Sequence, residues 1–299
     1  MTTHTEFFGC RHPIVCAAMN QVSDANLAIA VHDAGAFPSL SLPNYMRDGR
    51  FDAEAYTREL RTYKEGTGSE NLLLSVGGAG LLKDAVMRPF LDLGFRHVEL
   101  FHWHNAAPGW QDIVERSRRL SGELGVKFIF KISTGHVTHG LDYPTMLLKG
   151  PEGAGRTVDD APPLSESFDF CRMYLPQTQL IVSGGIHCAD QVRDYLHRGA
   201  LAVAIGSLFA ASRESAVSDG VKRKIIASSV TDLQTAGGRH LKGLFSKVVE
   251  GDDRNLTRTL ATGICDAADG GVFMGHAVGH ITEILSVKEI VHRLAGSFP

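Results

Sequence analysis

Two apolar segments late in the chain end in small residues, a pattern typical of a phosphate-binding site. Residues 180–186 read Leu-Ile-Val-Ser-Gly-Gly-Ile, and residues 202–207 read Ala-Val-Ala-Ile-Gly-Ser. Between them, residues 189–199 have the spacing of one amphipathic helix that ends in glycine. Neighbouring parallel strands that end in glycine can direct backbone N–H groups at one phosphate, because no Cβ blocks its approach. The sequence therefore predicts that a phosphorylated ligand binds after these two strands.

The elements that position this site alternate between apolar strands and helices, which is typical of a parallel α/β fold. Most strand segments are apolar throughout, as expected when both faces of a strand are buried. The predicted strands cover residues 13–18, 36–41, 71–76, 97–101, 126–132, 145–148, 179–183 and 202–206. Eight strands are the number that a closed (β/α)8 TIM barrel needs, and its phosphate site follows strands seven and eight.

The remaining segments predict helices, one short loop and an insertion. Helices are expected over residues 23–34, 52–64, 79–93, 110–124, 164–174 and 287–294. Residues 133–143 are too short and too rich in Gly and His for a crossover helix, so we expect a loop on the active face. After residue 212 the alternation fades, and residues 214–271 look largely helical and charged. We therefore expect a barrel over residues 1–212, a small helical substrate or lid domain inserted after strand eight over 213–271, and a return segment with the last barrel helix over 272–299.

Composition narrows the class of protein. The 299 residues are 43% hydrophobic and 21% charged, which suits a globular chain with a large core. A net charge of −3 provides no basic surface for nucleic acid. No apolar run is long enough to span a bilayer, the first residues lack a signal-peptide pattern, and the five cysteines form no CxxC pair. We expect a cytoplasmic protein that acts on a small molecule, has no membrane or nucleic-acid partner, and forms a homodimer by default.

Six segments, in order, resemble the nitronate monooxygenase family, once called 2-nitropropane dioxygenases. This family shares its fold and its FMN cofactor with FMN-dependent enoyl-ACP reductases. The similar segments are Pro-Ile-Val-Cys-Ala-Ala-Met at 13–19, Ala-Gly-Ala-Phe-Pro-Ser-Leu at 34–40, Lys-Gly-Pro-Glu-Gly-Ala-Gly at 149–155, Ser-Gly-Gly-Ile at 183–186, Gly-Ser-Leu-Phe at 206–209 and Met-Gly-His-Ala-Val-Gly at 274–279. The resemblance covers nearly the whole chain and implies an FMN-dependent oxidoreductase.

The resemblance also implies which residues bind FMN. Those expected beside the flavin ring are Ala18, Met19, Ser75, Lys131 and Ala154. Those expected around the phosphate are Ser183, Gly184, Gly185, Gly206 and Ser207. A lysine at the N1–C2=O edge of a flavin stabilises the negative charge that develops on reduction, which suits Lys131.

Three positions depart from the family pattern: Ala18 stands where the family has proline, His276 where it has glutamine, and the third departure is at the catalytic base. The family's catalytic base is a histidine directly after Glu-Ala-Gly-Gly, and this chain has Arg156 there. Arginine cannot accept a proton near neutral pH, but its guanidinium can bind a carboxylate, nitronate or phosphate through two hydrogen bonds. Either the base has moved or the reaction does not need one at this position.

Histidines elsewhere are candidates for a displaced acid or base. His136 and His139 lie on the loop after strand five, and His102 and His104 follow strand four. Imidazole suits proton transfer because its ordinary pKa of about 6.5 lies near working pH. These four histidines also suggest a metal site, but no carboxylates or thiolates cluster with them, so we expect no metal.

Three functions remain open from the sequence. The leading one is a nitronate monooxygenase-like oxidation of an anionic nitronate with O2, which needs no base and leaves Arg156 and Lys131 to hold the anion. The alternative is an FMN-dependent reductase, dehydrogenase or isomerase acting on an enone or enoyl thioester in a biosynthetic pathway, with His136 or His139 as proton donor. The third is a barrel that binds a phosphate-bearing ligand without redox catalysis.

Overall fold

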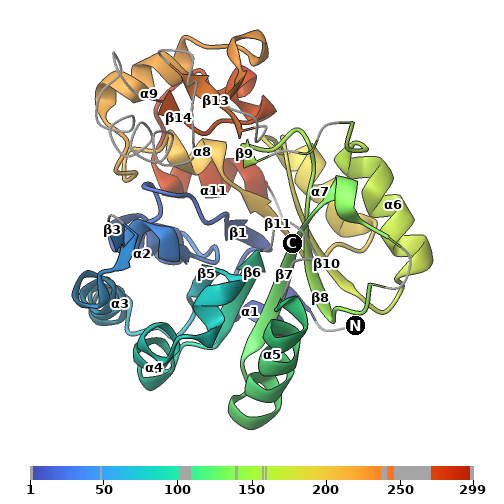
Figure 1. Cartoon of the computed structure of the whole chain (residues 1–299). Coiled ribbons are helices and arrows are strands. Elements are labelled where there is room, and N and C mark those ends of the chain that lie inside the picture. The colour runs from blue at the N-terminus through green and yellow to red at the C-terminus, as the bar shows by residue number, and fades with distance from the viewer. Residues whose placement is uncertain are drawn as a thin grey trace.

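Eight parallel strands of the computed structural model form one sheet in the order β1-β11-β10-β8-β7-β6-β5-β2 (Figure 1). The structure describes residues 3–47, 49–101, 109–138, 141–156, 158, 160–236, 241–245 and 271–296. The two outer strands meet where Val15 pairs in parallel with Phe37, just before β2. There the N–H of Cys16 donates to the carbonyl of Phe37, and the N–H of Phe37 donates to the carbonyl of Ile14, both at 2.8 Å. The sheet thus closes into a barrel, and the predicted (β/α)8 fold is confirmed.

Each predicted strand segment overlaps one barrel strand. The strands are β1 Ile14–Cys16, β2 Ser39–Ser41, β5 Leu73–Gly77, β6 His97–Phe101, β7 Lys127–Ser133, β8 Thr145–Lys149, β10 Gln179–Ser183 and β11 Ala202–Ile205. Their interior residues are buried, as their uninterrupted apolar character predicts. Charged or polar residues occur mainly at the strand ends, so chemistry is confined to the two ends of the barrel.

Helices surround this sheet (Figure 1). They are α2 Ala25–Asp33, α3 Ala53–Thr67, α4 Asp84–Asp92, α5 Trp110–Leu124, α6 Leu164–Tyr174, α7 Ala189–His197 and α11 Val287–Ala295. Helix α2 begins after Asp24, whose carboxylate accepts a hydrogen bond from the N–H of Leu27 at 2.9 Å. The helix predicted over 79–93 is divided into a 3-10 helix, η2 Gly78–Leu82, and α4, because Lys83 between them has extended dihedral angles. Among the described helices, none is both long and apolar enough to cross a membrane.

An additional short helix, α1 His4–Phe8, covers the amino-terminal end of the barrel. Its Phe7 and Phe8 are buried and pack with Phe37 and other inward-facing strand residues. The ring of His97, the first residue of β6, lies between these aromatic side chains, and its Nε2 is 2.7 Å from the carbonyl oxygen of Phe7. The sequence did not predict this helix. It closes one end of the barrel and leaves the carboxyl ends of the strands for a site.

The segment after β11 is only partly helical where the structure describes it. Helices α8 Ser207–Ala210 and α9 Asp219–Ile226 are followed by the strands β12 Gln234–Ala236, β13 Leu241–Phe245 and β14 Gly271–Val272. Strand β13 pairs antiparallel with β12, with β14 and with β9 Gly155–Arg156. The expectation of a largely helical segment is therefore wrong for β12 and β13, which form a small sheet with the loop after β8. The division into domains stays a prediction.

The other described elements are short. They are the hairpin β3 Met46–Arg47 with β4 Arg50–Phe51, and the 3-10 helices η1 Leu42–Tyr45, η3 Thr134–His136, η4 Val230–Asp232 and η6 His276–His280. Helix η3 is the only helix in the described part of residues 133–143, in agreement with the loop predicted there. In Figure 1 the elements α9, β13 and β14 lie together in a lobe above the barrel.

Candidate active site

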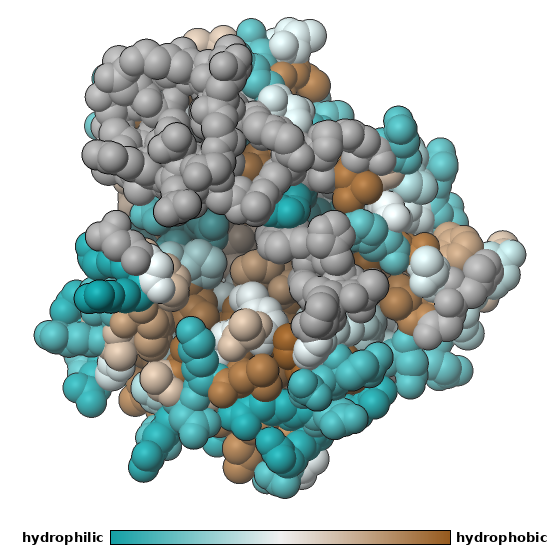
Figure 2. Space-filling model, viewed as in Figure 1, coloured by the Kyte–Doolittle hydropathy of each residue, from teal (hydrophilic) through white to brown (hydrophobic). Residues whose placement is uncertain are grey.

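A cavity of about 440 Å³ lies at the carboxyl ends of the barrel strands, under the small antiparallel sheet. This volume lies within the range of roughly 300–1,000 Å³ typical of ligand sites. Figure 2 shows apolar residues gathered between the upper lobe and the lower helices, with hydrophilic residues around the lower margin. All ten residues expected beside FMN line the cavity: Ala18, Met19, Ser75, Lys131, Ala154, Ser183, Gly184, Gly185, Gly206 and Ser207. Their roles in binding stay predictions.

The ends of β10 and β11 form a backbone cradle. Gly184 and Gly185 follow β10 with φ of +136° and +70°, a region that side chains rarely adopt. A Cβ on Gly185 would also lie 3.0 Å from the Cβ of Glu152. Gly206 follows β11 and leads into α8, where the hydroxyl of Ser207 accepts a hydrogen bond from the N–H of Gly275 at 3.1 Å. That hydroxyl keeps its own proton to donate, so this cradle offers donors suited to a phosphate.

A buried ion pair holds Lys131 near the carboxyl end of β7. Its Nζ lies 3.1 Å from Oε1 of Glu99, which has no solvent exposure. The hydroxyl of Ser75 donates to the same carboxylate oxygen at 2.6 Å. Glu99 and Ser75 come from the neighbouring strands β6 and β5, at paired register positions. The carboxylate therefore fixes the position of the Lys131 amine at the cavity wall and balances its charge.

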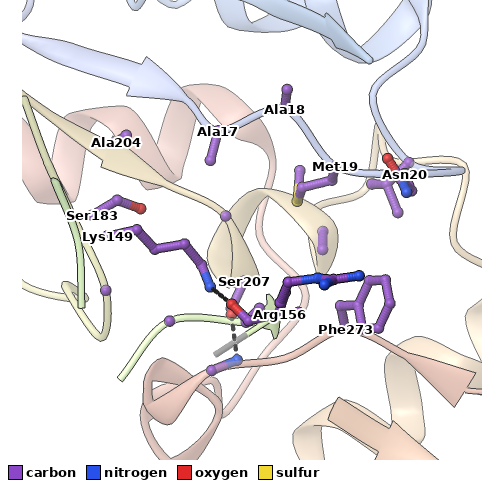
Figure 3. Close-up of a pocket in the computed structure, with 18 of the residues that line it drawn as sticks. Ala17, Ala18, Met19, Asn20, Lys149, Arg156, Ser183, Ala204, Ser207 and Phe273 are labelled. Carbon is purple, nitrogen blue, oxygen red and sulfur yellow. Dashed lines mark hydrogen bonds between the residues drawn. The ribbon is translucent and has the colours of Figure 1, made fainter. Parts of the chain in front are cut away.

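Lys149 places a second amine in the cavity wall. It ends β8 beside Ser183 of the cradle, and its Nζ donates to the backbone carbonyl of Arg156 (Figure 3). Burial in the cavity wall, together with the positive charges of Lys131, Lys242 and Arg156, lowers the pKa of Lys149 to about 7. This amine can therefore gain or lose a proton near neutral pH.

Arg156 reaches the cavity because β9 pairs with β13. The register places Arg156 opposite Leu241, and Gly155 opposite Lys242. In Figure 3 the Arg156 side chain extends alongside the ring of Phe273, which follows β14. The pairing of two segments about 85 residues apart thus positions the guanidinium that stands where the family has a histidine.

Of the four histidine candidates, the structure describes only His136. His136 lies in η3 and is not one of the described lining residues. His139, His102 and His104 lie outside the described residues. Among the lining residues that the structure describes, the charged side chains are Lys131, Lys149 and Arg156, with no carboxylate and no histidine. Within the same residues, no three His, Cys, Asp or Glu side chains are placed to hold a metal ion.

The sequence contained signals for two site residues that its interpretation missed. Glu99 is a single acidic residue inside the apolar segment 97–101, where a buried carboxylate requires a partner. Lys149 directly follows the apolar segment 145–148, at the strand end where barrel active sites are located. The partner of each residue could not be predicted from these signals, because the ion-pair partner of Glu99 and the hydrogen-bond partner of Lys149 come from other strands.

A match to a protein family supports the resemblance drawn from the segments above. Residues 178–296 match the family model described as nitronate monooxygenase. This range contains the cradle, β13 and the return segment. The resemblance to that family is confirmed, and no match is found among curated proteins.

Solved structures with the same fold include enzymes of both related types. FabK from Thermotoga maritima has 19% identity and a TM-score of 0.75, over 98% of this chain and 95% of that chain. A nitroalkane oxidase from Streptomyces ansochromogenes has 18% identity and a TM-score of 0.75, over 98% and 97%. The enoyl reductase domain of MlnA, from the macrolactin biosynthesis cluster of Bacillus amyloliquefaciens, has 11% identity and a TM-score of 0.70, over 97% and 95%. At these identities the likeness establishes the fold.

Proposed function

We propose that this chain is an FMN-dependent oxidoreductase that oxidises an anionic nitronate with O2. The family match over residues 178–296 supports an oxidoreductase of this superfamily. The observation that carries the choice of substrate is the charge of the cavity. Its described lining holds the three basic side chains Lys131, Lys149 and Arg156, and neither a carboxylate nor a histidine. Such a lining favours a ligand that is itself an anion.

The residues present fit FMN. The cradle of Ser183, Gly184, Gly185, Gly206 and Ser207 would hold the phosphate, since its backbone can be approached closely at two positions that need glycine. Ala18, Met19 and Ala154 would border the ring, because they offer small or adaptable apolar surface on the cavity wall. FMN supplies a ring that accepts electrons from the substrate and passes them to O2.

The chain's own residues would bind and orient the substrate. Arg156 can donate two parallel hydrogen bonds to the two oxygens of a nitronate, a geometry that a lysine cannot reproduce. Lys131 would contribute a second positive group from β7, held in place by its ion pair with Glu99 at 3.1 Å. Leu241, Val272 and Phe273 from the small sheet add apolar surface to the cavity, which excludes water and strengthens these charge contacts.

The test is an anaerobic titration of FMN-loaded protein with propionate 3-nitronate, followed by the visible flavin spectrum. Loss of the oxidised flavin absorbance is expected with the nitronate and not with neutral nitroethane. Arg156→Ala should raise the nitronate concentration needed by at least about tenfold, since a charge-assisted bidentate contact is worth more than about 1.4 kcal/mol. Its FMN content should stay unchanged, and Arg156→Lys should restore only part of the affinity. Equal reaction of nitroethane and its nitronate, or an unchanged spectrum with both, would contradict the proposal.

The alternative is a reductase, dehydrogenase or isomerase acting on an enone or enoyl thioester. One observation favours it: Lys149 carries an amine with a pKa of about 7 in the cavity wall, so it can deliver a proton to a reduced double bond. Lys149 replaces His136 in that role, because His136 does not line the cavity. Consumption of NAD(P)H that depends on an added enone or enoyl thioester, together with no reaction of the nitronate, would select this alternative.

A further inference from the structure

Lys149 connects the two parts of the cavity that are suited to anions. Its backbone lies in register with Ser183, the first residue of the cradle. Its amine reaches the carbonyl of Arg156, and in Figure 3 the Arg156 side chain extends from there toward Phe273. The Lys149 side chain therefore runs from the strand end beside the cradle to the backbone of Arg156, and an oxyanion bound along this stretch would contact its amine.

Positive charges surround this amine, and the neighbouring acids are engaged elsewhere. The charged groups that face it are Lys131 on β7, Lys242 on β13 and Arg156 on β9, all of which oppose a further positive charge. Glu99 is paired with Lys131. Among the residues that the structure describes, no carboxylate forms an ion pair with Lys149. A charged ammonium here lacks the counter-ion that a buried charge needs.

Glu152 is the other acid near this wall, and its described hydrogen bond and charge contacts involve groups other than Lys149. Its Oε1 accepts a hydrogen bond from the N–H of Leu164 at 3.2 Å, and its charge acts on Lys242 and His276. It therefore belongs to the neighbouring polar cavity behind the cradle, which it lines with His276. It does not supply the missing negative charge.

The lysine side chain is also confined. The position of a Cβ on Gly153 lies only 3.2 Å from Cε of Lys149, so the chain backbone packs directly against the lysine stem. Exposed lysines extend their amines into water to keep their charge. The amine of Lys149 instead remains at the cavity wall, bonded to the carbonyl of Arg156.

We propose that Lys149 is a proton-coupled anion contact: its amine is neutral in the ligand-free cavity and takes up one proton when an oxyanion binds beside it. The proton comes from solvent and forms a fourth bond to Nζ, with no other bond made or broken. The bound anion then supplies the missing counter-charge, so the cavity changes its own charge to match its ligand. This proposal rests on the proposed function only for the choice of FMN as one probe.

The direct test follows the protonation of Lys149 in the whole chain by NMR. Protein labelled with ¹³C at lysine Cε is titrated with acid and base, and the Lys149 signal is identified by its absence in Lys149→Met. The midpoint is expected near 7 in ligand-free protein and is expected to rise by at least one pH unit with a bound oxyanion. A ligand-free midpoint near the ordinary lysine value of about 10.4 would overturn the proposal, and so would a midpoint that no anion moves.

Two probes distinguish the source of the oxyanion. FMN is added to ligand-free protein with riboflavin, which lacks the phosphate, as its control. Nitrate, a planar and redox-inert oxyanion, is added separately to FMN-loaded and to ligand-free protein. A shift with FMN and not riboflavin assigns the contact to the phosphate, and a shift with nitrate assigns it to the substrate side. Because the ligand-free titration and the nitrate arm need no flavin, failure of FMN to bind would contradict the proposed function and leave this test intact.

Binding measurements provide a second readout. At pH 8, wild-type protein should take up about 0.4 proton per bound anion if the bound midpoint is near 8, and about 0.9 if it lies well above 9, seen as a dependence of calorimetric heat on the buffer. Its affinity should fall with rising pH, by up to about tenfold per pH unit, between the ligand-free and the bound midpoints. Lys149→Arg is always charged, so it should bind the anion with no proton uptake and with a flat pH profile. Equal proton uptake by wild-type and Lys149→Arg proteins would contradict the proposal.

Discussion

Removing the Lys131 amine should destabilise the fold because it isolates a buried carboxylate. Glu99 has no solvent exposure, and one of its oxygens accepts from Lys131 at 3.1 Å and from Ser75 at 2.6 Å. Its other oxygen, Oε2, has no hydrogen-bond partner among the described residues. In Lys131→Met the carboxylate keeps only the Ser75 hydroxyl. Loss of one partner of a buried pair typically costs about 3–5 kcal/mol, most of it from the charge left behind.

The structure places this cost near the lower end of that range. The Lys131 side chain is 17% exposed, so water through the cavity already solvates part of the pair. The retained bond from Ser75 to a charged acceptor offsets a further part. We therefore expect Lys131→Met to lower the free energy of unfolding by about 3 kcal/mol, and Glu99→Gln to lower it by about 1 kcal/mol. The double variant should be more stable than Lys131→Met alone, because it no longer buries an unpaired charge.

Urea unfolding of the four proteins, with Lys83→Met as an exposed-lysine control, checks this expectation. With a slope of about 1–3 kcal/mol per molar urea, a loss of about 3 kcal/mol moves the midpoint by roughly 1 M or more. The control should stay within about 0.5 kcal/mol of wild type. If Lys131→Met unfolds at the wild-type midpoint, or if the double variant is less stable than Lys131→Met, the stated role of Glu99 is refuted.

Two further predictions concern the two ends of the barrel. Burial lowers the pKa of His97 to about 4, so the folded state binds fewer protons than the unfolded state between pH 6.5 and 4. The free energy of unfolding should therefore fall by up to roughly 3 kcal/mol when the pH is lowered from 6.5 to 4. His97→Gln should lack this part of the pH dependence when both proteins are unfolded with urea at each pH. The same pH dependence in both proteins would contradict the prediction. Gly185→Ala should lower FMN affinity by more than about tenfold, because φ is +70° and its Cβ would meet Glu152 at 3.0 Å. Gly125→Ala is the matched control, because its φ is +66° and nothing lies within 4 Å of the added Cβ. It should lose about 1 kcal/mol of stability from the same backbone strain but keep the wild-type affinity for FMN, as equilibrium titration with FMN would show.

The barrel could be predicted because its signals are local. A strand of a parallel barrel is buried on both faces, so a continuous apolar run such as 145–148 identifies it without knowledge of its neighbours. The glycine pair at 184 and 185 marks the end of β10 for the same reason, since its positive φ values are a property of the residues themselves. The cavity lining followed from these strand ends once the sheet was taken as closed.

The small sheet over the cavity could not be predicted because its stability is not local. Strand β9 has two residues, and it exists only where residues 155 and 156 pair with 242 and 241. Helix α1 has five residues, and its two phenylalanines find their partners on strands distributed along the chain. Such short elements carry too little periodicity to be identified before the tertiary contacts are known.

The charges of the site oppose the stability of the fold, and this opposition is itself an argument for a ligand. Lys131, Lys149 and Arg156 all line one cavity, where Glu99 pairs with Lys131 and no described carboxylate forms an ion pair with Lys149. The positive charges of Lys131 and Arg156 lower the pKa of Lys149 and so oppose its protonation, and a purely structural role would favour an apolar side chain of similar size at this position. A bound anion removes this cost and should therefore stabilise the folded chain. We therefore expect this cavity to bind an anion.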